Sequence, residues 1–377
     1  MGQQMQPAGL FKIGRRWIGA RQPLFVIAEI GLNHDGDVDR ALRLVDAAAD
    51  AGADAVKLQT LRASDLVADD CPAPVHVAAA SLRDLFARYE LQEDAHQAVA
   101  ARARARGLAF LSTPLYEDAV DLLERVDCDA YKIASGDLTH HPLIARAART
   151  GKPLILSTGL SSLAEVRGAL RCAERAGARA VALLHCVSAY PVPDGQENLG
   201  AIATLAREYA CPVGWSDHGR HDAVALGVAL ALGTSIYERH IKLSPDDPVL
   251  DADVSSPPDE IAAIVATARR AHQVMGDGRR EPQPAERANI VPSRRGLYAT
   301  RDLAAGHVIT ADDIIALRPA RGLPPEHWHT LVGTRVTRPI PAGAPFTAAD
   351  LPAADPAPAS VREPSAIGRQ GAAHAQA

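Results

Sequence analysis

Two segments, GWSDH (214–218) and SIYERH (235–240), decide the fold, and an Ala/Leu/Val/Gly-rich helical run over 223–232 lies between them. Each segment has the composition of a buried strand and ends in a histidine. In an α/β barrel the carboxyl ends of all strands open on one face, so side chains that are distant in sequence converge there. We therefore expect His218 and His240 to point at one common site.

Two histidines that point at one site are a candidate metal site. Two imidazoles can hold a divalent cation such as Mn, Fe or Zn and leave coordination positions for water and substrate oxygens. An open coordination position supports Lewis-acid catalysis. The alternative is that each histidine only forms a hydrogen bond with a loop carbonyl. The residues around the pair decide between a metal site and two structural histidines.

The composition indicates an α/β protein with an aliphatic core. The chain has 377 residues, of which 47% are hydrophobic but only 4% aromatic. Parallel strands covered by helices need such a core, and a barrel of roughly 250 residues leaves room for a small second domain. The net charge is -5 and the basic residues are scattered. This pattern argues against a nucleic-acid or anionic-membrane partner.

The cysteine spacing and the hydropathy indicate the cellular compartment in which the protein works. The five cysteines are widely spaced and form no Cys-x-x-Cys motif, which favours reduced thiols. The N-terminus lacks the apolar core of a signal peptide, and no apolar run is long enough to span a bilayer. We therefore expect a soluble, cytoplasmic protein.

Apolar runs with strand character alternate regularly with amphipathic helical runs. The runs lie at 24–30, 55–58, 108–111, 130–134, 153–156, 180–184, 212–215 and 235–241. Eight strand–helix units close a barrel. The segment 11–23 predicts a hairpin that plugs the barrel floor. The segment 61–91 is too long for an ordinary loop, and it predicts either a lid or an inserted helical piece.

The pattern changes after residue 276. We predict a barrel domain over 1–276, a polar, Pro-rich linker over 277–292, a small β-rich domain over 293–351 and a disordered tail over 352–377. Strand candidates in the small domain are 297–299, 307–310 and 333–336. The stretch 301–313 resembles the stretch 338–350, which predicts a pseudo-symmetric fold.

The predicted strand ends are almost all polar. They carry Glu29, Lys57, Gln59, Ser112, Thr113, Lys132, Ser135, Ser157, Thr158, His185, Ser216, His218, Glu238 and His240. The two lysines, Lys57 and Lys132, stand in otherwise apolar strands, where an unpaired ammonium is costly. Each lysine therefore needs an anionic partner.

Two kinds of partner are open for Lys57 and Lys132. One is a barrel carboxylate such as Glu29 or Glu238. The other is a bound phosphate or carboxylate. The hydroxyls around the lysines and the backbone N–H groups after 157–159 would also donate hydrogen bonds to such an anion. Because two lysines are ringed by Ser and Thr, we favour a small, doubly anionic ligand near a divalent metal. Phosphoenolpyruvate fits that description.

The chain from about Phe25 to Asp350 also resembles the sialic acid synthase family. The resemblance rests on AEIGLNH (28–34), VKLQT (56–60), STP (112–114), YKIASG (131–136), LSTG (156–159), LHC (184–186), YP (190–191), SDH (216–218) and ERH (238–240). It implies a (β/α)8 TIM barrel followed by a small β-rich antifreeze-like (SAF/β-clip) domain. It also implies a transferase that condenses phosphoenolpyruvate with an N-acylated mannosamine-type sugar, giving a nine-carbon 2-keto acid and phosphate.

The resemblance assigns roles by position. Phosphoenolpyruvate would be held by Lys57, Thr113, Lys132, Ser135, Ser157 and Ser216, and Mn or Mg by His218 and His240. The sugar would face Glu29, Gln59, Tyr190, Asp251 and Arg318, the last reaching it from the partner subunit of a domain-swapped homodimer. Glu29 is the candidate for moving protons at the aldehyde oxygen or the attacking water.

The chain departs from the family pattern at three places. Ser188 replaces a family asparagine, as in some legionaminic-type members. The residues before Asp251 are Val249 and Leu250 rather than Gly-Pro, so Asp253 is an alternative to Asp251. The stretch 320–322, which follows the arginine–proline pair, also differs. The acceptor therefore stays open between N-acetylmannosamine, its 6-phosphate and a 2,4-diacetamido-2,4,6-trideoxyhexose of the legionaminic or pseudaminic type.

Two other functions remain as alternatives. A Schiff-base aldolase would use Lys132 or Lys57 as a nucleophile on pyruvate. A non-catalytic sugar-binding or ice-binding protein would keep a relic barrel, but a relic has no reason to retain buried lysines.

Overall fold

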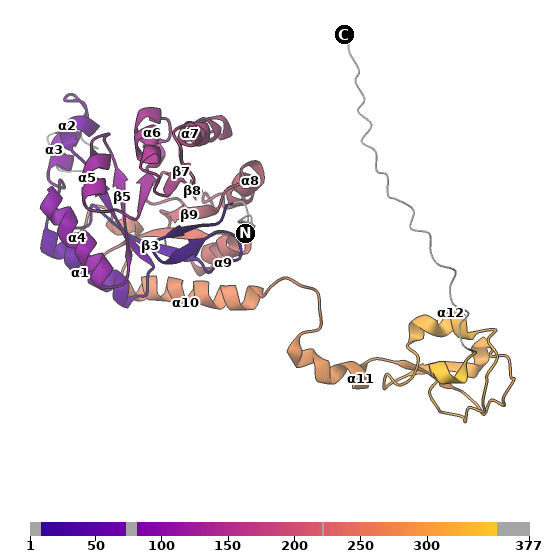
Figure 1. Ribbon diagram of the computed structural model, residues 1–377. Helices are drawn as coiled ribbons and strands as arrows, with labels where there is room; N and C mark the ends of the chain where they lie inside the picture. Colours follow the sequence, from indigo (N-terminus) through magenta and orange to yellow (C-terminus); the bar gives the residue numbers. More distant parts are fainter. Residues whose placement is uncertain (1–8, 73–80, 221, 353–377) are drawn as a thin grey trace, which may run out of the picture. The chain divides into compact units, whose positions relative to one another are not determined.

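The computed structural model describes residues 9–72, 81–220 and 222–352. The chain forms two compact units, Met1–Gly278 and Arg279–Ala377. Figure 1 follows the chain through both, and each unit is described by itself. The predicted tail lies outside the described residues from position 353 onward.

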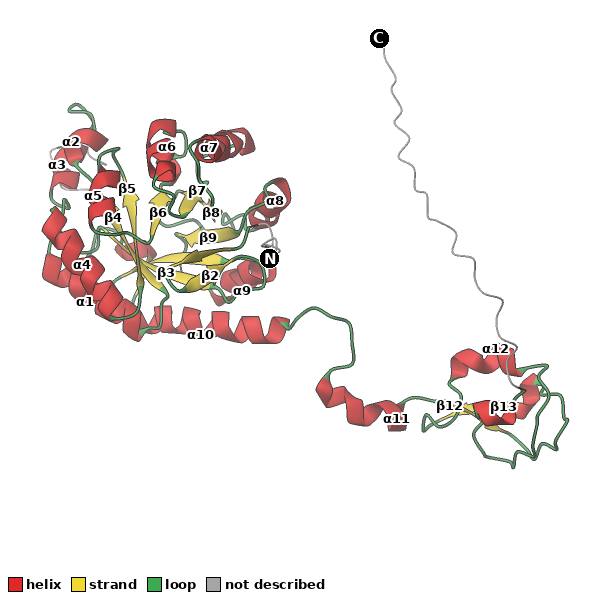
Figure 2. Cartoon of the chain, in the orientation of Figure 1, coloured by secondary structure: helices red, strands yellow, loops and turns green. Residues whose placement is uncertain are grey.

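The larger unit is a closed barrel of parallel strands (Figure 2). The barrel strands are β3 (Phe25–Gly31), β4 (Ala55–Thr60), β5 (Ala109–Pro114), β6 (Ala130–Ile133), β7 (Leu154–Ser157), β8 (Val181–Cys186), β9 (Val213–Asp217) and β10 (Ile236–Ile241). Neighbours in sequence pair in parallel, and β10 pairs with both β9 and β3, which closes the barrel. All eight predicted strands are found, so the predicted TIM barrel is confirmed.

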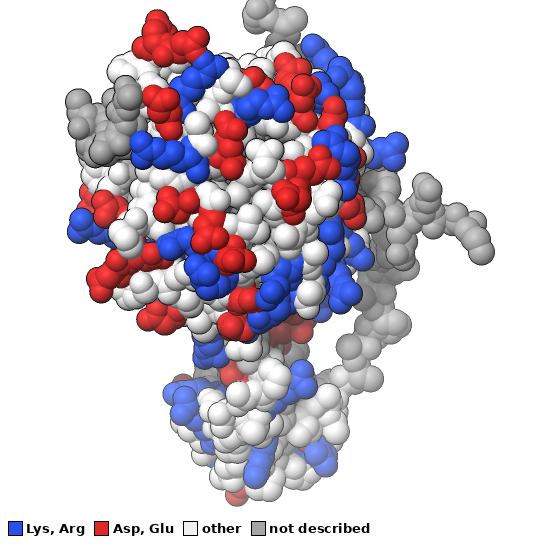
Figure 3. All heavy atoms as spheres, turned by 90° about the vertical axis from the view of Figure 1, so that its left-hand side faces the viewer, with Lys and Arg blue, Asp and Glu red and all other residues white. Residues whose placement is uncertain are grey.

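Helices cover the outside of the barrel, as Figure 2 shows. They are α1 (Val38–Asp50), α4 (Glu93–Ala105), α5 (Ala119–Arg125), α6 (His141–Arg149), α7 (Leu163–Arg175), α8 (Gly200–Glu208), α9 (Ala223–Ala231) and α10 (Pro258–Met275). Acidic and basic side chains are interspersed on the face seen in Figure 3. Between α1 and α4, for example, Arg102 and Arg106 both pair with Asp46.

The alternation along each strand decides where the strand-end side chains point, because successive residues face opposite sides of the sheet. In β3, Val26 and Ile30 pack in the outer core with the helices, whereas Phe25 and Ile27 pack in an inner core within the barrel. Glu29 continues the inner series. The same alternation places Lys57, Lys132, Ser216 and His240 on the inside of the barrel, because residues next to them in the strands pack in the outer core.

The barrel floor is filled by the N-terminal hairpin. Strands β1 (Phe11–Ile13) and β2 (Arg16–Ile18) pair antiparallel. Their side chains Phe11, Ile13 and Ile18 belong to the same inner core as Phe25 and Ile27. The predicted plug is therefore confirmed.

The long segment between β4 and α4 is an inserted helical piece where it is described. It contains α2 (Ala63–Leu66) and α3 (Leu82–Ala87). Leu61, Leu85 and Tyr89 pack with Leu32, which follows β3. Gly36, at φ +73°, touches the Arg88 carbonyl so closely that any side chain would collide with it.

The smaller unit has its own core. Strands β12 (Gly296–Ala299) and β13 (Ile314–Leu317) pair antiparallel. The predicted strand at 297–299 is thus confirmed. The segments 307–310 and 333–336 are joined by an isolated bridge between Val308 and Arg335 and by backbone hydrogen bonds, but they are not assigned as strands. Sequence reasoning missed β13. The core residues are Leu297, Ala299, Leu303, Ile309, Ile314, Leu331, Val336, Ile340 and Phe346.

The two similar stretches of this unit form two equivalent structures. In one, Asp313 closes a capping box with Thr310 and receives a bond from Arg301 Nε at 2.7 Å. In the other, Asp350 does the same with Thr347, and Arg338 Nε lies 2.6 Å away. A buried aspartate thus anchors each copy through an arginine twelve residues earlier in the chain. The predicted pseudo-symmetry is confirmed.

The segment that we predict to be a linker contains short helical turns, η3 (Pro284–Asn289) and α11 (Ile290–Ser293). Pro284 stands at the start of η3, where its fixed φ suits a helical turn. Within the described residues, no helix is long and apolar enough to cross a membrane.

Candidate active site

A ring of polar side chains lies at the carboxyl end of the barrel. This strand-end ring consists of Glu29, Lys57, Gln59, Thr113, Lys132, Ser157, Ser216, Glu238 and His240, with His218 directly after β9. All of them except Gln59 are buried. The geometry therefore brings together residues whose positions span more than half of the chain.

Two lysine–carboxylate pairs form the centre of the ring. Lys57 Nζ lies 2.7 Å from Glu29 Oε2, and Lys132 Nζ lies 2.9 Å from Glu238 Oε1. Lys57 Nζ is also 3.8 Å from Glu238 Oε2, so the pairs form one network. The barrel carboxylates are thus the partners of both lysines, and charge balance alone does not require a bound anion.

The ammonium groups nevertheless keep donors for a ligand. Each lysine carries three N–H donors. Lys57 uses one on Glu29 and one on Thr113 Oγ1, which is 3.0 Å away, and Lys132 uses one on Glu238. Counting the contacts among the described residues, three donors are left at the centre of the ring.

Burial and charge shift the two carboxyl groups in opposite directions. Burial raises the pKa of Glu29; the charge of Lys57 opposes this and that of Glu238 adds to it. Burial also acts upward on the pKa of Glu238, but Lys132 and Lys57 outweigh it and hold that pKa well below its usual range. Glu29 is therefore the carboxyl that takes up a proton more readily, and Glu238 is the one that stays charged.

Serine hydroxyls surround the lysines. Ser216 Oγ donates to Glu238 Oε1 at 2.8 Å, and Ser135 Oγ accepts the backbone N–H of Gly159 at 3.2 Å. A side chain at position 159 would collide with the hydroxyls of Ser135 and Ser188. Glycine at this position therefore keeps the serine hydroxyls close to the backbone after β7.

The two histidines of the ring face each other. The ring centroids of His218 and His240 are 5.6 Å apart, and Tyr190 stacks on His218 at 4.3 Å. His218 Nδ1 lies 3.3 Å from the Val187 carbonyl, which favours a proton on Nδ1 and leaves Nε2 as the acceptor atom. Burial lowers the pKa of both histidines, that of His218 to about 3. Both are therefore neutral imidazoles, the form that binds metals.

Besides Glu29 Oε2, which is ion-paired with Lys57, three buried atoms of the ring make no hydrogen bond within the described residues. They are Ser157 Oγ, Glu238 Oε2 and His240 Nδ1. Buried polar groups are nearly always hydrogen-bonded in native structures, so unpartnered atoms need an explanation. Their gathering in one ring indicates that the ring is built for a polar ligand.

An acidic side chain lies beside the histidine pair. Asp251 Oδ2 lies 3.3 Å from the unbonded Nδ1 of His240. No group of three or more His, Cys, Asp or Glu side chains in the described part of the chain is arranged to hold an ion alone. Two neutral imidazoles with open positions are typical of a catalytic rather than a closed structural site.

The residues predicted to face the sugar lie in different surroundings. Gln59 Nε2 donates to Glu29 Oε1 at 3.0 Å, so it holds the carboxyl group. Tyr190 is 55% exposed although its ring packs on His218. Arg318 follows β13 in the smaller unit, so its contact with the sugar stays a prediction.

The structure distinguishes the two candidate aspartates. Asp251 faces His240, whereas Asp253, in η2 (Ala252–Val254), is exposed. Buried Asn33 holds the loop, because its side chain donates to Ser255 Oγ at 2.8 Å and accepts the backbone N–H of Asp251 at 3.3 Å. Asp251 is therefore the aspartate at the ring.

Two expected strand-end residues point away from the ring. His185 faces outward, with Nε2 2.7 Å from the Glu197 carbonyl, and Ser112 bonds Thr60 Oγ1 at 2.7 Å behind the sheet. Each is one residue out of phase with an inward neighbour. In place of His185, the inward residue of β8 is Cys186, whose Sγ lies 3.5 Å from His218 Nδ1. Strict counting of strand alternation would have found Cys186.

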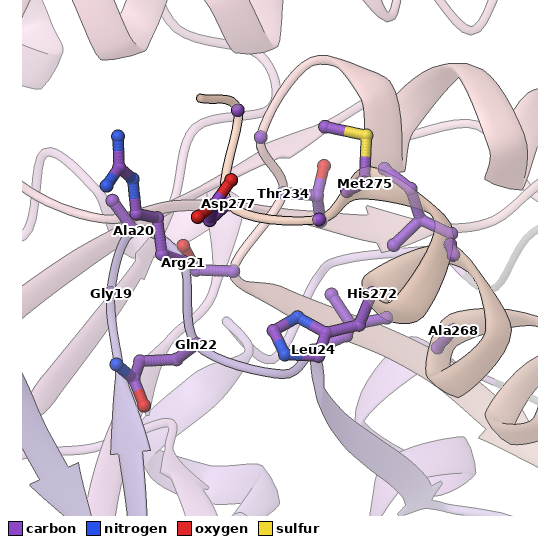
Figure 4. Close-up of a pocket in the computed structure, with 16 residues that line it drawn as sticks. Gly19, Ala20, Arg21, Gln22, Leu24, Thr234, Ala268, His272, Met275 and Asp277 are labelled. Carbon is purple, nitrogen blue, oxygen red and sulfur yellow. The ribbon is translucent and has the colours of Figure 1, made fainter. Parts of the chain in front are cut away.

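Two hollows differ in their relation to the ring. One, of about 550 Å³, lies near the carboxyl ends of β7 and β8 and is lined by Thr158, Cys186 and Ser188, but no residue of the ring lines it. The other, of about 360 Å³, lies at the opposite, amino-terminal end of the strands (Figure 4). It is lined by Gln22, His272 and other residues, none of which belongs to the ring. The side chains of the ring, rather than either hollow, therefore place the candidate active site.

A closed barrel with polar side chains gathered at the carboxyl ends of its strands is the architecture of an α/β-barrel enzyme. The chain belongs to the NeuB family, whose family model matches residues 44–280. A SAF domain matches residues 294–352, so the predicted C-terminal domain is confirmed. The family resemblance seen in the sequence is thus confirmed over both units.

Relatives match along most of their length. An uncharacterized protein of Methanocaldococcus jannaschii is 38% identical over 86% of this chain and 94% of its own. N,N'-diacetyllegionaminic acid synthase of Legionella pneumophila is 34% identical over 86% of this chain and 94% of its own. The crystal structure of N-acetylneuraminic acid (sialic acid) synthetase from Leptospira borgpetersenii matches with a TM-score of 0.69 and 32% identity, covering 76% of this chain and 97% of that one.

Proposed function

We propose that this enzyme condenses phosphoenolpyruvate with an N-acylated amino sugar, giving a nine-carbon 2-keto acid and phosphate. The observation that carries the proposal is the strand-end ring, where spare lysine donors and unpartnered polar atoms adjoin two neutral histidines. Sialic-acid-type and legionaminic-acid-type synthases among the relatives support the same reaction class.

Phosphoenolpyruvate brings a phosphate and a carboxylate, and the ring offers donors for both. The spare N–H groups of Lys57 and Lys132 supply charge-assisted hydrogen bonds, which are stronger than neutral ones. The hydroxyls of Thr113, Ser135, Ser157 and Ser216 complete the set, and Ser157 has no other partner among the described residues. Glu238 stays charged and keeps both ammonium groups in place.

His218 and His240 would hold a divalent cation, Mn or Mg. When bound, such a cation supplies Lewis-acid polarisation of the sugar aldehyde oxygen. The contribution of the chain itself is to keep both imidazoles neutral and buried. Tyr190 shields the outer face of His218 by stacking on it, which limits the access of water from that side.

Glu29 handles the protons of the reaction. Its raised pKa and its bond from Gln59 suit a group that gives and takes a proton in turn. Carbon 3 of phosphoenolpyruvate attacks the aldehyde carbon, and Glu29 protonates the resulting alkoxide. Water then adds at carbon 2 and gives a proton back to Glu29. Phosphate finally leaves by C–O cleavage, which forms the 2-keto group.

The acceptor sugar would lie over Gln59, Tyr190 and Asp251. Ser188, smaller than the family asparagine, suits a diacetamido-trideoxyhexose of the legionaminic type as well as N-acetylmannosamine. Arg318 would reach the sugar from the partner subunit of a domain-swapped homodimer. The Schiff-base alternative is weaker, because a nucleophilic amine needs a depressed pKa. In Lys132 burial lowers the pKa, but the charge and hydrogen bond of Glu238 together with the charge of Glu29 outweigh it and raise the pKa.

The test is phosphate release from phosphoenolpyruvate by the metal-stripped protein, with and without Mn, against a panel of these sugars. Release that needs both the metal and one sugar supports the proposal and names the acceptor. Borohydride trapping of a lysine adduct with pyruvate, together with condensation activity that survives EDTA, would favour the aldolase. If phosphoenolpyruvate does not bind even with Mn, the assignment of the ring is wrong.

A further inference from the structure

A buried ion pair lies directly behind the two histidines of the ring. Asp217 of β9 and Arg239 of β10 are opposite each other in the strand register, and each is the sequence neighbour of one histidine. Their side chains face the outer side of the sheet, with Arg239 Nη1 3.2 Å from Asp217 Oδ2. Arg239 is 2% exposed and is the largest of the fully buried side chains in the described residues.

On one side, the pair holds the loop that carries His218. Arg239 Nη1 donates to the Gly219 carbonyl at 2.6 Å, and the Gly219 N–H donates to Asp217 Oδ1 at 2.8 Å. Tyr237 adds a third bond, from its hydroxyl to Asp217 Oδ2 at 2.6 Å. Both backbone groups of Gly219, the residue after His218, are therefore bonded to the pair.

On the other side, the same guanidinium holds the loop that carries Asp251. Arg239 Nε donates to Ser256 Oγ at 2.9 Å. Ser256 belongs to β11 (Ser255–Ser256), which pairs with β10 at His240. Ser255 Oγ in turn donates to the Asp251 carbonyl at 2.6 Å. One side chain thus connects the backbone segments of His218, His240 and Asp251.

Stability is a poor explanation for such a pair. Replacing a buried ion pair with apolar residues of similar volume is often neutral or stabilising, because the desolvation of both charges offsets their attraction. The outer core around it is otherwise mainly aliphatic, with the aromatic rings of Trp215 and Tyr237 nearby. A planar guanidinium with five donors, however, fixes several acceptors in one geometry, which no aliphatic side chain can do.

We propose that Arg239 and Asp217 are positioning residues that set the geometry of the His218–His240 pair for cation binding. The inference rests on the proposed metal-binding role of the two histidines. Groups behind metal-ligating side chains typically contribute about 10- to 100-fold to metal affinity. We expect a loss of that size in Mn²⁺ affinity when the pair is broken, before any substrate is added.

The experiment is Mn²⁺ titration of the metal-stripped full-length protein, followed by electron paramagnetic resonance, with thermal unfolding measured in parallel. The variants are Asp217→Asn, Arg239→Lys and His240→Ala. The matched control is Asp54→Asn. Asp54 also accepts a strand N–H, from Val26 at 2.9 Å, and pairs with Arg16 at 2.7 Å, but it does so at the other end of the barrel.

The expected result is a weaker Mn²⁺ affinity for Asp217→Asn and Arg239→Lys, by about 10- to 100-fold, and an unchanged affinity for Asp54→Asn even where its melting temperature falls. Wild-type affinity in both pair variants, or an equal loss in Asp54→Asn, would overturn the inference. Failure of the proposed function looks different. In that case the wild type does not bind Mn²⁺, or His240→Ala binds it as tightly as the wild type does.

A milder comparison covers the case in which the pair variants do not fold. Tyr237→Phe removes one bond to Asp217, whereas Tyr131→Phe removes a part-buried bond from β6 to Glu124, of 2.7 Å. Weaker Mn²⁺ binding in Tyr237→Phe alone supports the positioning role. Equal binding in both phenylalanine variants contradicts it.

Discussion

Lys132 Nζ lies 2.9 Å from Glu238 Oε1, although the two residues are 106 positions apart in the chain. The bond crosses the barrel from β6 to β10, and Ser216 shares the same carboxylate oxygen. Together with the Lys57–Glu29 pair, it makes the centre of the ring electrically balanced before any substrate arrives. It also makes the ring sensitive to the loss of one partner.

Replacing Lys132 by Met should therefore destabilise the protein. The variant leaves the buried Glu238 carboxylate with the Ser216 hydroxyl at 2.8 Å and with Lys57, at 3.8 Å, as its remaining positive charge. Breaking a buried pair in this way typically costs about 3–5 kcal/mol. Urea unfolding at neutral pH measures the change. The double variant Lys132→Met/Glu238→Gln should recover part of the loss, because no unpaired charge remains. If the double variant is less stable than the single one, the pair does not act as described.

Replacing Glu29 by Gln should abolish turnover while phosphoenolpyruvate binding stays near normal. The amide keeps the size of the side chain but cannot carry the proton that the reaction moves. Loss of a general acid–base group typically lowers kcat by about 10²- to 10⁴-fold. Steady-state phosphate release gives kcat, and calorimetry gives the affinity. Normal turnover in this variant would remove Glu29 from the proposed role.

The two neighbouring aspartates should differ in their effect. Asp251→Asn should lower kcat/KM for the sugar by about tenfold or more, because Asp251 lies beside His240 and a charge-assisted bond is worth more than a neutral one. KM for phosphoenolpyruvate should change little. Asp253→Asn is the matched control, since Asp253 is exposed. Equal effects of the two variants would contradict the placement of Asp251 at the sugar.

His34 should make stability depend on pH. Burial, with a smaller contribution from His96, lowers the pKa of His34 from its usual 6.5 to about 4. Between these pH values the unfolded chain binds a proton that the folded protein does not, so stability should rise with pH from about 4 to about 6.5. The full effect is of the order of 3 kcal/mol. Unfolding curves at several pH values should show a shallower rise for His34→Gln. An unchanged slope would mean that His34 titrates normally in the folded protein.

If Arg318 reaches the sugar site of the partner subunit, two inactive variants should complement each other in a mixed dimer. Glu29→Gln and Arg318→Ala should each be inactive alone. In a mixed dimer, the barrel with intact Glu29 receives Arg318 from the other subunit. Statistical mixing then restores about a quarter of the wild-type activity per site. Subunits unfolded together and refolded together provide the mixture, and separately refolded proteins are the control. No recovery would mean that Arg318 acts within its own subunit or not at all.

Much of the architecture follows from local pattern. The eight apolar runs, the plug hairpin and the repeat of the smaller unit are each encoded by residues close together in sequence. Hydrophobic periodicity and turn residues act over such short distances. β13 was missed because its four residues, Ile314–Leu317, carry no turn signal of their own and pair only through tertiary contact with β12.

The sequence by itself determined which side chains end the strands, and therefore which chemistry the barrel offers. The tertiary structure alone decided which of them meet. Strand phase turned His185 and Ser112 outward and Cys186 inward, and loop packing brought Asp251 rather than Asp253 to His240. The barrel closure of β10 onto β3 and β9 joined Lys132 to Glu238 and placed the Asp217–Arg239 pair behind the histidines. The physical reason is that polarity and periodicity are local properties of the chain, whereas phase, register and pairing are set by contacts between segments that only the folded barrel brings together.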